Sequence, residues 1–340
     1  MALVVIRAGT LATIQDGGRF GYQQVGVGPS GAMDLHALQT ANMLVGNESC
    51  VPAIEIMYGE TSFLVERPML IAICGFGMKV EVTKAQSSVV QEQRTLLPLW
   101  RPVAVSIGMQ LYFSPEKKGL AMYMAIWGGV QAAVELGSSS TALRSGLGGL
   151  PPGGGKSLAA GDRITHHHPS EQAVKIYKSF QPMLSPTWFA NAAPYYPQTN
   201  TAIRIIVGAQ FAELTEQSKH RLLHTTFRVS SQSDRMGYRL QGELLKLANA
   251  EELISEPVAT GTMQLPPSGE PIILLADRQT TGGYPRIAHV CTIDLPKLAQ
   301  LKPGDKVTFQ LVSLQEAEAL LLQQAQSFAL LKTAITLKLR

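Results

Sequence analysis

Residues 274–285 read Leu-Leu-Ala-Asp-Arg-Gln-Thr-Thr-Gly-Gly-Tyr-Pro, and they lie between two apolar runs. The first run, 272–275, and the second, 287–293, are typical of buried β-strands. Between them, the polar residues and the Gly-Gly pair predict a loop that can bend sharply or approach a ligand closely. Binding residues often lie on loops that a rigid sheet holds in place. A plain polar hairpin is the alternative, although such a hairpin does not need Asp, Arg, Gln and two Thr in succession.

The composition indicates a folded protein with packed cores. The chain has 340 residues, of which 45% are hydrophobic and 16% are charged, with a formal net charge of +4. This length favours two domains, and the charge is too small and too scattered to indicate nucleic-acid binding. No apolar stretch reaches the roughly 18 residues that a membrane-spanning helix needs. Three cysteines far apart in the chain favour reduced thiols in a cytoplasmic protein.

Most of the sequence reads as short apolar strands separated by Gly and Pro, a spacing typical of β-barrels and sandwiches. Helices are expected at 33–45, at 209–224 and from Ser313, where Ser313 and Glu316 form a capping box. Prolines concentrated between 182 and 200 predict a domain break. We therefore expect a mainly β fold. Its parts would be an N-terminal β-barrel domain (1–190), a C-terminal β-barrel domain (201–315) and a C-terminal helix (313–336).

Two further polar loops resemble the first. One contains Gln15-Asp-Gly-Gly-Arg19 and continues to Ser30-Gly-Ala-Met-Asp34, just before a predicted helix. Free amide groups at a helix N-terminus can bind an anion, so Ser30 and Asp34 are candidates; alternatively, they only cap the helix.

The other polar loop is Ser230-Ser-Gln-Ser-Asp-Arg-Met-Gly-Tyr-Arg239. Its arginines offer planar guanidinium groups that match a carboxylate or phosphate, which lysine would not. A structural network between Asp234 and Arg235 is the alternative.

Metal and nucleotide motifs are incomplete. Gly155-Lys-Ser157 ends a Gly-rich segment, but Leu150 stands where a phosphate-binding P-loop needs glycine. The adjacent histidines 166–168 would alternate between the faces of a strand and could not easily chelate one ion. His220 and His224 lack the glutamate that a zinc protease has between its ligands. The sequence therefore predicts no metal site formed by this chain alone.

The motifs occur in an order that resembles one family closely. They are Gln15-Asp-Gly-Gly-Arg19, Ser30-Gly-Ala-Met-Asp34, Glu55, Ser231-Gln-Ser-Asp-Arg-Met-Gly-Tyr-Arg239, Gln264-Leu-Pro-Pro267 and 271–285. The chain resembles the allophanate hydrolase subunit 2 family, also called biotin-dependent carboxyltransferase-like, over residues 3–315. The resemblance implies two cyclophilin-like β-barrel domains. Two positions depart from the family pattern, because Gln131 and Ala142 stand where the family often has acidic residues.

The resemblance also implies a function. The chain would be one component of an ATP-dependent 5-oxoprolinase complex, which hydrolyses the lactam of 5-oxoproline to glutamate. Its partners would be the B subunit of that complex, similar to allophanate hydrolase subunit 1, and the A subunit, with no nucleic acid or membrane partner. The complex would use ATP, with or without Mg²⁺, and no Met-Lys-Met site for attached biotin occurs here. Two alternatives remain: a carboxyltransferase-type subunit that acts on urea or a related amide, and a non-catalytic regulator that binds a kinase-inhibitor-like partner.

Lactam opening requires the carbonyl to be activated and the anionic groups to be held. We expect Asp277, Arg278 and Asp234 to be catalytic: the arginine would bind an oxyanion, and a carboxylate would accept the lactam N–H, orient an arginine or help to bind Mg²⁺. The candidates for binding substrate or anion are Arg19, Ser30, Asp34, Ser231, Gln232, Arg235, Tyr238, Gln279, Thr280, Thr281 and Tyr284. We expect these loops to converge on one cleft, at the barrel mouths or at the interface with the B subunit.

Overall fold

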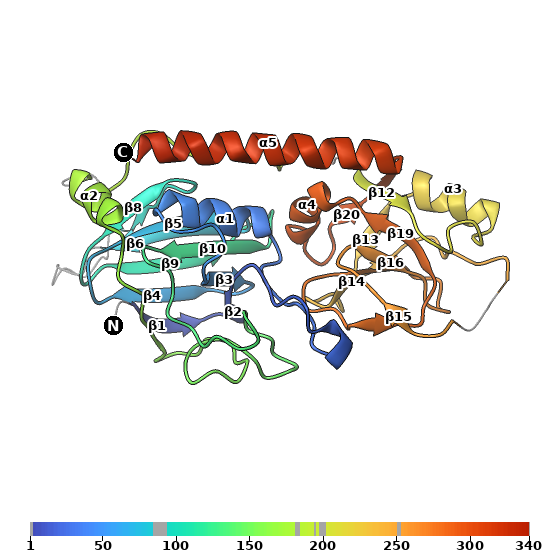
Figure 1. Ribbon diagram of the computed structural model, residues 1–340, viewed down its shortest axis with the longest axis horizontal. Helices are drawn as coiled ribbons and strands as arrows, with labels where there is room; N and C mark the ends of the chain where they lie inside the picture. Colours follow the sequence, from blue (N-terminus) through green and yellow to red (C-terminus); the bar gives the residue numbers. More distant parts are fainter. Residues whose placement is uncertain are drawn as a thin grey trace. The chain divides into compact units, whose positions relative to one another are not determined.

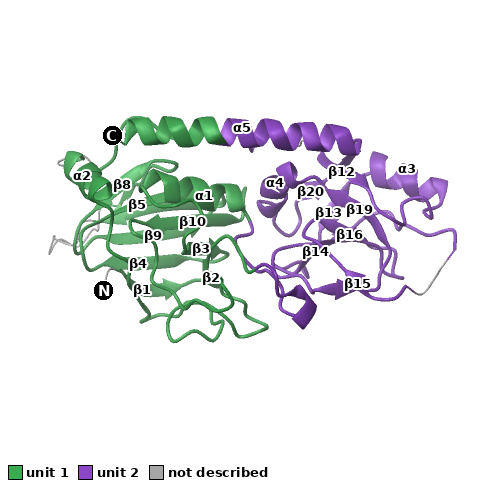
Figure 2. Cartoon of the chain, viewed as in Figure 1, with its two compact units in different colours: residues 1–19, 34–192, 329–340 green, residues 20–33, 193–328 purple. Residues whose placement is uncertain are grey.

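The computed structural model describes residues 3–83, 94–180, 184–193, 195–196, 202–249 and 253–339. The fold is mainly β, which confirms the prediction from the sequence. The chain forms two compact units (Figure 2). Unit 1 contains residues 1–19, 34–192 and 329–340, and unit 2 contains residues 20–33 and 193–328. Residues 20–33 of the N-terminal half therefore belong to unit 2, and residues 329–340 of the C-terminal half belong to unit 1.

Within the described residues, unit 1 contains two antiparallel sheets (Figure 1). The first has the strand order β11-β1-β4-β9-β6-β7 and the second has the order β2-β3-β10-β5-β8. Their bounds are β1 (Leu3–Ala8), β2 (Leu11–Gln15), β3 (Ala53–Met57), β4 (Thr61–Val65), β5 (Met69–Gly75), β6 (Met78–Thr83), β7 (Thr95–Leu96), β8 (Pro102–Val105), β9 (Gln110–Pro115), β10 (Ala121–Ile126) and β11 (Arg163–Ile164).

The second sheet of unit 1 forms the centre of its core. Every residue of β3, β5 and β10 is buried, and α1 (Leu35–Leu44) packs against β5 and β10. The sequence predicted α1, and Asp34 caps it by accepting a hydrogen bond from the backbone N–H of Ala37 at 3.0 Å. A second helix, α2 (Glu171–Ser179), also packs against β5. The end of β2 and the start of α1 are thus held on a rigid, fully packed support.

The described part of unit 2 forms a nearly closed barrel sheet of eight strands and a small two-stranded sheet, β15-β18. The barrel order is β20-β13-β14-β17-β16-β19-β12-β21, in which β12 and β21 are parallel. The strand bounds are β12 (Ile203–Val207), β13 (Phe227–Val229), β14 (Gly237–Gln241), β15 (Glu256–Pro257), β16 (Thr262–Gln264), β17 (Ile272–Leu274), β18 (Thr281–Gly282), β19 (Arg286–Val290), β20 (Lys306–Val307) and β21 (Phe309–Leu311).

Unit 2 also contains the short helices η1 (Gln23–Val25), α3 (Glu216–His224), η2 (Thr292–Asp294) and α4 (Leu295–Ala299). The predicted helix at 209–224 is present only in its second half. Thr215 accepts a hydrogen bond from the N–H of Ser218 at 3.2 Å, so this threonine caps α3, and the preceding residues form turns instead.

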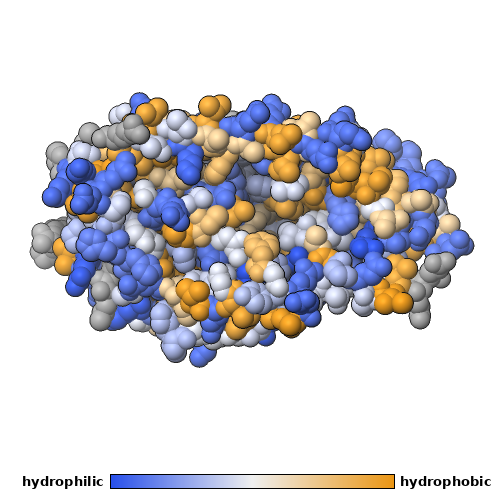
Figure 3. Space-filling model, in the orientation of Figure 1, coloured by the Kyte–Doolittle hydropathy of each residue, from blue (hydrophilic) through white to orange (hydrophobic). Residues whose placement is uncertain are grey.

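The last helix, α5 (Leu314–Lys338), begins with the predicted capping box. The N–H of Glu316 donates to Ser313 Oγ at 3.1 Å, and the Glu316 carboxylate accepts from the N–H of Ser313 at 2.7 Å. Apolar side chains are exposed along α5, among them Leu322 and Leu330, and apolar atoms are visible where α5 lies in Figure 3. No helix in the described residues is long and apolar enough to cross a membrane.

Candidate functional site

In unit 2, backbone hydrogen bonds bring two of the predicted polar loops together. The N–H of Leu275 donates to the carbonyl of Met236, and the N–H of Asp277 donates to the carbonyl of Arg235, both at 2.9 Å. The N–H of Arg278 then donates to the carbonyl of Leu275 at 3.2 Å, which closes a turn directly after β17. The loop before β14 and the loop after β17 therefore form one assembly on adjacent strands of the barrel.

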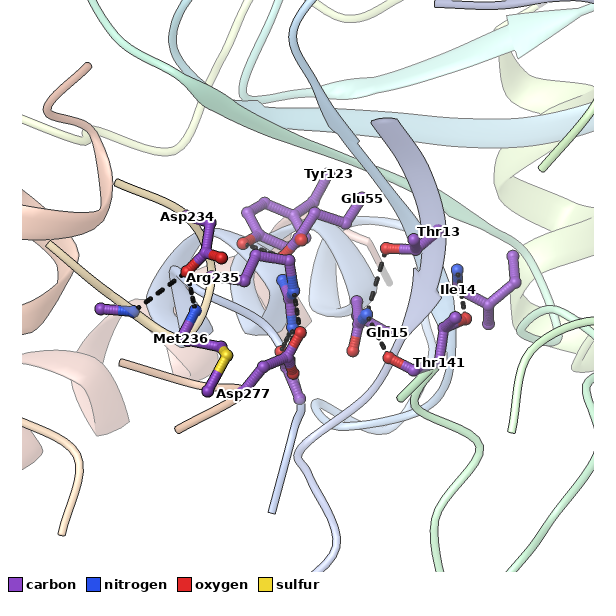
Figure 4. A network of polar contacts seen from close by, with 12 residues as sticks. Thr13, Ile14, Gln15, Glu55, Tyr123, Thr141, Asp234, Arg235, Met236 and Asp277 are labelled. Carbon is purple, nitrogen blue, oxygen red and sulfur yellow. Dashed lines mark hydrogen bonds and ion pairs between the residues drawn. The ribbon is translucent and has the colours of Figure 1, made fainter. Parts of the chain in front are cut away.

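A buried ion pair joins the same two loops (Figure 4). Arg235 Nε donates to Asp277 Oδ2 at 2.8 Å and Arg235 Nη2 donates to Asp277 Oδ1 at 3.2 Å. The Arg235 side chain is 5% exposed and that of Asp277 is 14% exposed. Arg235 Nη2 also donates to the carbonyl of Gly31 at 2.6 Å. This fork-to-fork geometry fixes both side chains, so Arg235 ties three segments of unit 2 together.

The other candidates in the first of these loops lie in varied settings. Asp234 is exposed, and its Oδ1 accepts from the N–H groups of Met236 and Gly237 (2.8 and 3.3 Å), which stabilises its own turn. Ser231 and Gln232 are exposed. Tyr238, in contrast, is buried, and its hydroxyl donates to the carbonyl of Leu301 at 2.9 Å. Tyr238 therefore joins β14 to the segment that follows residues 295–299.

Arg278 differs from Arg235 in having no acid to pair with among the described residues. It is only 7% exposed, and its Nε and Nη1 are buried without a hydrogen-bond partner in that part of the chain. Burial lowers the pKa of this guanidinium from its usual value. A buried charge that lacks a hydrogen-bonding partner is costly. Such a group is expected where a ligand supplies the missing acceptors.

The remaining candidates of the 274–285 loop lie on the strands and turns beside Arg278. Gln279 Nε2 donates to the buried Gln264 Oε1 at 3.4 Å, and Thr281 belongs to β18, where it pairs with Pro257 of β15. The Thr280 carbonyl accepts a hydrogen bond from the N–H of Val258 at 3.2 Å. Tyr284 is 46% exposed. The loop thus has a hydrogen-bonded base and exposed side chains above it.

Residues 20–33 form a strap across this loop of unit 2. Gln23 Nε2 donates to the carbonyls of Thr280 (2.6 Å) and Val258 (3.0 Å). A Cβ at Gly28 would lie 2.9 Å from the carbonyl oxygen of Arg278, so only glycine allows this close approach. Ser30 lies in the same strap and has a φ of 51°, in the left-handed region. The strap therefore supports the backbone on which Arg278 lies.

Two candidates from the N-terminal loop lie in unit 1, and the first, Arg19, holds the structure together. Arg19 is 1% exposed, and it donates from Nε to the Glu135 carbonyl at 2.8 Å and from Nη2 to the carbonyls of Ser138 and Ser140. The carboxylate of Asp16 accepts from both hydroxyls of Ser138 and Ser140. Arg19 and Asp16 thus fasten the end of β2 to residues 135–140.

The other candidate of unit 1, Asp34, lies beside the buried Tyr123, which is hydrogen-bonded to Glu55 (both labelled in Figure 4). The N–H of Asp34 donates to the Tyr123 hydroxyl at 2.8 Å, and that hydroxyl donates to Glu55 Oε2 at 2.6 Å. Burial, followed by the charges of Glu55 and Asp34, raises the pKa of Tyr123 well above its usual value. Tyr123 therefore stays protonated and donates its hydrogen bond permanently.

Comparison with known proteins gives the family. A family model described as "Carboxyltransferase domain, subdomain A and B" matches residues 25–311. The chain belongs to this carboxyltransferase-domain family. It is 35% identical to the C subunit of 5-oxoprolinase from Escherichia coli (strain K12), over 93% of this chain and 93% of that protein.

Two longer proteins are also similar to this carboxyltransferase-domain chain. Urea amidolyase of Lachancea kluyveri is 28% identical over 94% of this chain, which spans only 17% of that protein. The crystal structure of the Kluyveromyces lactis urea carboxylase superposes with a TM-score of 0.80 at 27% identity, over 97% of this chain and 29% of that one. The chain thus corresponds to a minor part of the urea-processing proteins and to nearly the whole of the 5-oxoprolinase component.

In this carboxyltransferase-domain chain, the candidate residues divide between the units. Arg19 and Asp34 belong to unit 1, and the rest, including Ser30, belong to unit 2. Convergence of all the loops on a single cleft stays a prediction. The described residues contain no group of three or more His, Cys, Asp and Glu side chains that could hold a metal ion.

The sequence assigned no structural role to Gln23 and Gln264. Their side-chain amides donate hydrogen bonds to the backbone of the 274–285 loop. Both lie in or beside motifs that the family resemblance covers, but a lone glutamine has no spacing signal that marks its partner.

Proposed function

We propose that this carboxyltransferase-domain chain is one component of an ATP-dependent 5-oxoprolinase complex, active together with the A and B subunits of that complex in the cytoplasm. Its likeness to the C subunit of the E. coli 5-oxoprolinase, which extends over 93% of both chains, supports this proposal. The 5-oxoprolinase complex would open the lactam ring of 5-oxoproline to give glutamate, and ATP would activate the lactam carbonyl.

The observation that carries the proposal is the buried guanidinium of Arg278, whose Nε and Nη1 lack hydrogen-bond partners in the described residues. Both the substrate, a carboxylate, and ATP, a phosphate donor, present oxyanions. A guanidinium binds either one through short, charge-assisted hydrogen bonds, and a dry setting strengthens them. In this proposal, Arg278 contacts the oxyanion.

The residues around Arg278 then take distinct roles. Asp277 already accepts two hydrogen bonds from Arg235, so this pair positions the Arg278 backbone. Asp234 is exposed, and its Oδ2 accepts no hydrogen bond from the described residues. We therefore assign to Asp234 the carboxylate that can accept a proton. Side chains that orient the substrate are Ser231, Gln232, Gln279, Thr280, Thr281 and Tyr284.

The test combines this chain with its candidate A and B subunits and measures glutamate release from 5-oxoproline, with and without ATP. We expect glutamate only when all chains and ATP are present. Arg278→Ala should reduce turnover by at least about 100-fold, because a buried charged hydrogen-bonding group in the site is worth several kcal/mol. Arg228→Ala is the matched control, since Arg228 lies on an exposed position of β13 in the same unit.

The outcomes separate the roles of Arg278. Loss of turnover with a raised KM for 5-oxoproline indicates the substrate carboxylate, whereas a raised KM for ATP indicates the phosphate. Near-normal turnover of the Arg278→Ala complex would remove Arg278 from the site. A stable complex with no ATP-dependent glutamate release would refute the function itself.

A second candidate function is a carboxyltransferase subunit that uses urea or a related amide. The match of the K. lactis urea carboxylase structure over 97% of this chain favours it. Supplying the assembled complex with urea, ATP, bicarbonate, a biotinylated carrier protein and a biotin carboxylase tests this candidate. Urea-dependent ATP consumption without any activity on 5-oxoproline would select it over the first.

A further inference from the structure

Gln15, at the end of β2 in unit 1, has a buried amide group that is only half satisfied. Its side chain is fully buried, and its Nε2 donates to Thr13 Oγ1 and to the carbonyl of Thr141, both at 3.1 Å. Its Oε1 is buried and accepts no hydrogen bond from the described residues. Figure 4 shows both of these hydrogen bonds starting from the Gln15 nitrogen, while no bond is drawn to its oxygen.

The orientation of this amide is fixed by its partners. A backbone carbonyl can only accept a hydrogen bond, so the group that faces the Thr141 carbonyl must be the NH₂ of Gln15. Rotating the amide by 180° would place two acceptors against each other. The oxygen is therefore held in place as an acceptor with no donor among the described residues, an arrangement that native interiors rarely tolerate without a reason.

The strand beside Gln15 presents a further acceptor and a small residue. Gln15 lies opposite Ala53 on β3, so its partner on that strand is a small side chain. Two residues earlier on the same face, Thr13 lies opposite Glu55, whose carboxylate accepts from Tyr123. Because the Tyr123 hydroxyl stays protonated, its only hydrogen is committed to Glu55 and cannot reach Gln15. The missing donor must come from outside the described residues.

We propose that Gln15 Oε1 accepts a hydrogen bond from the N–H of a small amide ligand and so selects amides over isosteric esters. The choice of a lactam or urea-type amide as ligand rests on the proposed function above. The unpaired state of Gln15 Oε1 among the described residues is independent of that function. Gln15 is then a specificity-determining residue of unit 1. A site built to accept an N–H rejects an analogue that lacks it, because its own polar group is left unpaired.

The experiment compares 5-oxoproline with the lactone in which a ring oxygen replaces the ring N–H. Binding of each is measured by isothermal titration, to this chain of 340 residues and to its complex with the A and B subunits. The wild-type protein should prefer the lactam by about tenfold, the size of one buried hydrogen bond. Gln15→Met, which has a similar length but no acceptor, should bring the two affinities within about twofold.

Two variants control for folding. Gln110→Leu removes a half-buried glutamine from β9 of the same unit and should keep the preference for the lactam. Gln15→Glu keeps an oxygen in place and, when protonated, can still donate to Thr141, so it should retain most of the preference. Melting temperatures are recorded for Gln15→Met, Gln15→Glu and Gln110→Leu.

Equal affinity of the wild-type protein for both probes would overturn the proposal, even if Gln15→Met failed to fold. It would also be overturned if Gln15→Met folded and kept the tenfold preference. A Gln15-dependent preference for the lactam, or for urea over its N-methylated forms, in a complex that releases no glutamate would refute the proposed function and leave this inference intact.

Discussion

At the scale of single residues, the two arginines of the 230–239 and 274–285 loops illustrate different uses of the same side chain. Arg235 is paired with Asp277 and with a backbone carbonyl, whereas Arg278 is buried with two nitrogens unpaired among the described residues. An unpaired buried charge opposes folding, and binding sites tolerate this cost because the ligand offsets it. Removing the charge of Arg278 should therefore raise the free energy of unfolding and lower the turnover.

Arg278→Met tests this opposition, since methionine fills a similar volume without a charge. We expect the free energy of unfolding to rise by about 1–2 kcal/mol, because desolvation of the guanidinium no longer opposes folding. ATP-dependent turnover should be lost at the same time. Thermal melts and glutamate assays on the same preparations measure both effects. A variant that is less stable than the wild type would mean that Arg278 contributes to the core.

At the scale of elements, one buried carboxylate joins three parts of the unit 2 barrel. Asp294, at the end of η2, accepts from the N–H, Nε and Nη2 of Arg204 on β12 (2.7–2.9 Å) and from Lys297 of α4 at 2.6 Å. Burial opposes ionisation of Asp294, but hydrogen bonds from Arg204 and Lys297 outweigh it and hold the pKa of this carboxyl below its usual value. The ionised form therefore stabilises the barrel.

Asp294→Asn should lower the free energy of unfolding by about 2–4 kcal/mol at pH 7, because Arg204 and Lys297 lose their charged partner. The pKa of Asp294 is lower in the folded than in the unfolded state. The carboxylate's contribution is therefore complete above about pH 4 and is lost as the pH falls further. Urea unfolding of the wild type and the variant between about pH 3 and pH 7 should show their difference in free energy of unfolding becoming smaller at the acidic end. A difference in free energy of unfolding that stays constant across this pH range would argue against the ion pairs of Asp294 with Arg204 and Lys297.

Sequence patterns predicted those elements whose signals are local. The capping box of α5 and the polar loop after β17 depend on residues close together in the chain, as does the cap of α1 at Asp34, which the sequence offered as an alternative to anion binding. The role of Arg19 could not be predicted in this way. Its guanidinium donates to carbonyls that lie 116 to 121 residues later, in a Ser-rich segment whose sequence carries no signal for an arginine partner. The orphan oxygen of Gln15 likewise appears only once Thr13 and Thr141 are placed.

At the scale of the whole molecule, the chain crosses between its two units more than once. Residues 20–33, near the N-terminus, belong to unit 2, and residues 329–340, at the C-terminus, belong to unit 1. The first segment is held by the hydrogen bonds of Gln23 and by Arg235 on the Gly31 carbonyl. In the second, the Leu339 carbonyl accepts from Gln172 of α2 at 3.3 Å, and Ile335 is buried. Neither unit is completed by a continuous stretch of chain.

This exchange predicts that the protein survives a cut between its units. A protease site inserted between residues 192 and 193 would leave the strap 20–33 on the N-terminal fragment and residues 329–340 on the C-terminal fragment. We expect the two fragments to elute together from a size-exclusion column after cleavage, because each carries a packed segment of the other's unit. Adding Gly28→Ala should weaken this association, since its Cβ would press on the Arg278 carbonyl at 2.9 Å. Ala159→Gly, on an exposed turn of unit 1, is the control and should leave it unchanged. Fragments that separate under native conditions would show that the strap and the C-terminal segment contribute too little to hold the chain together.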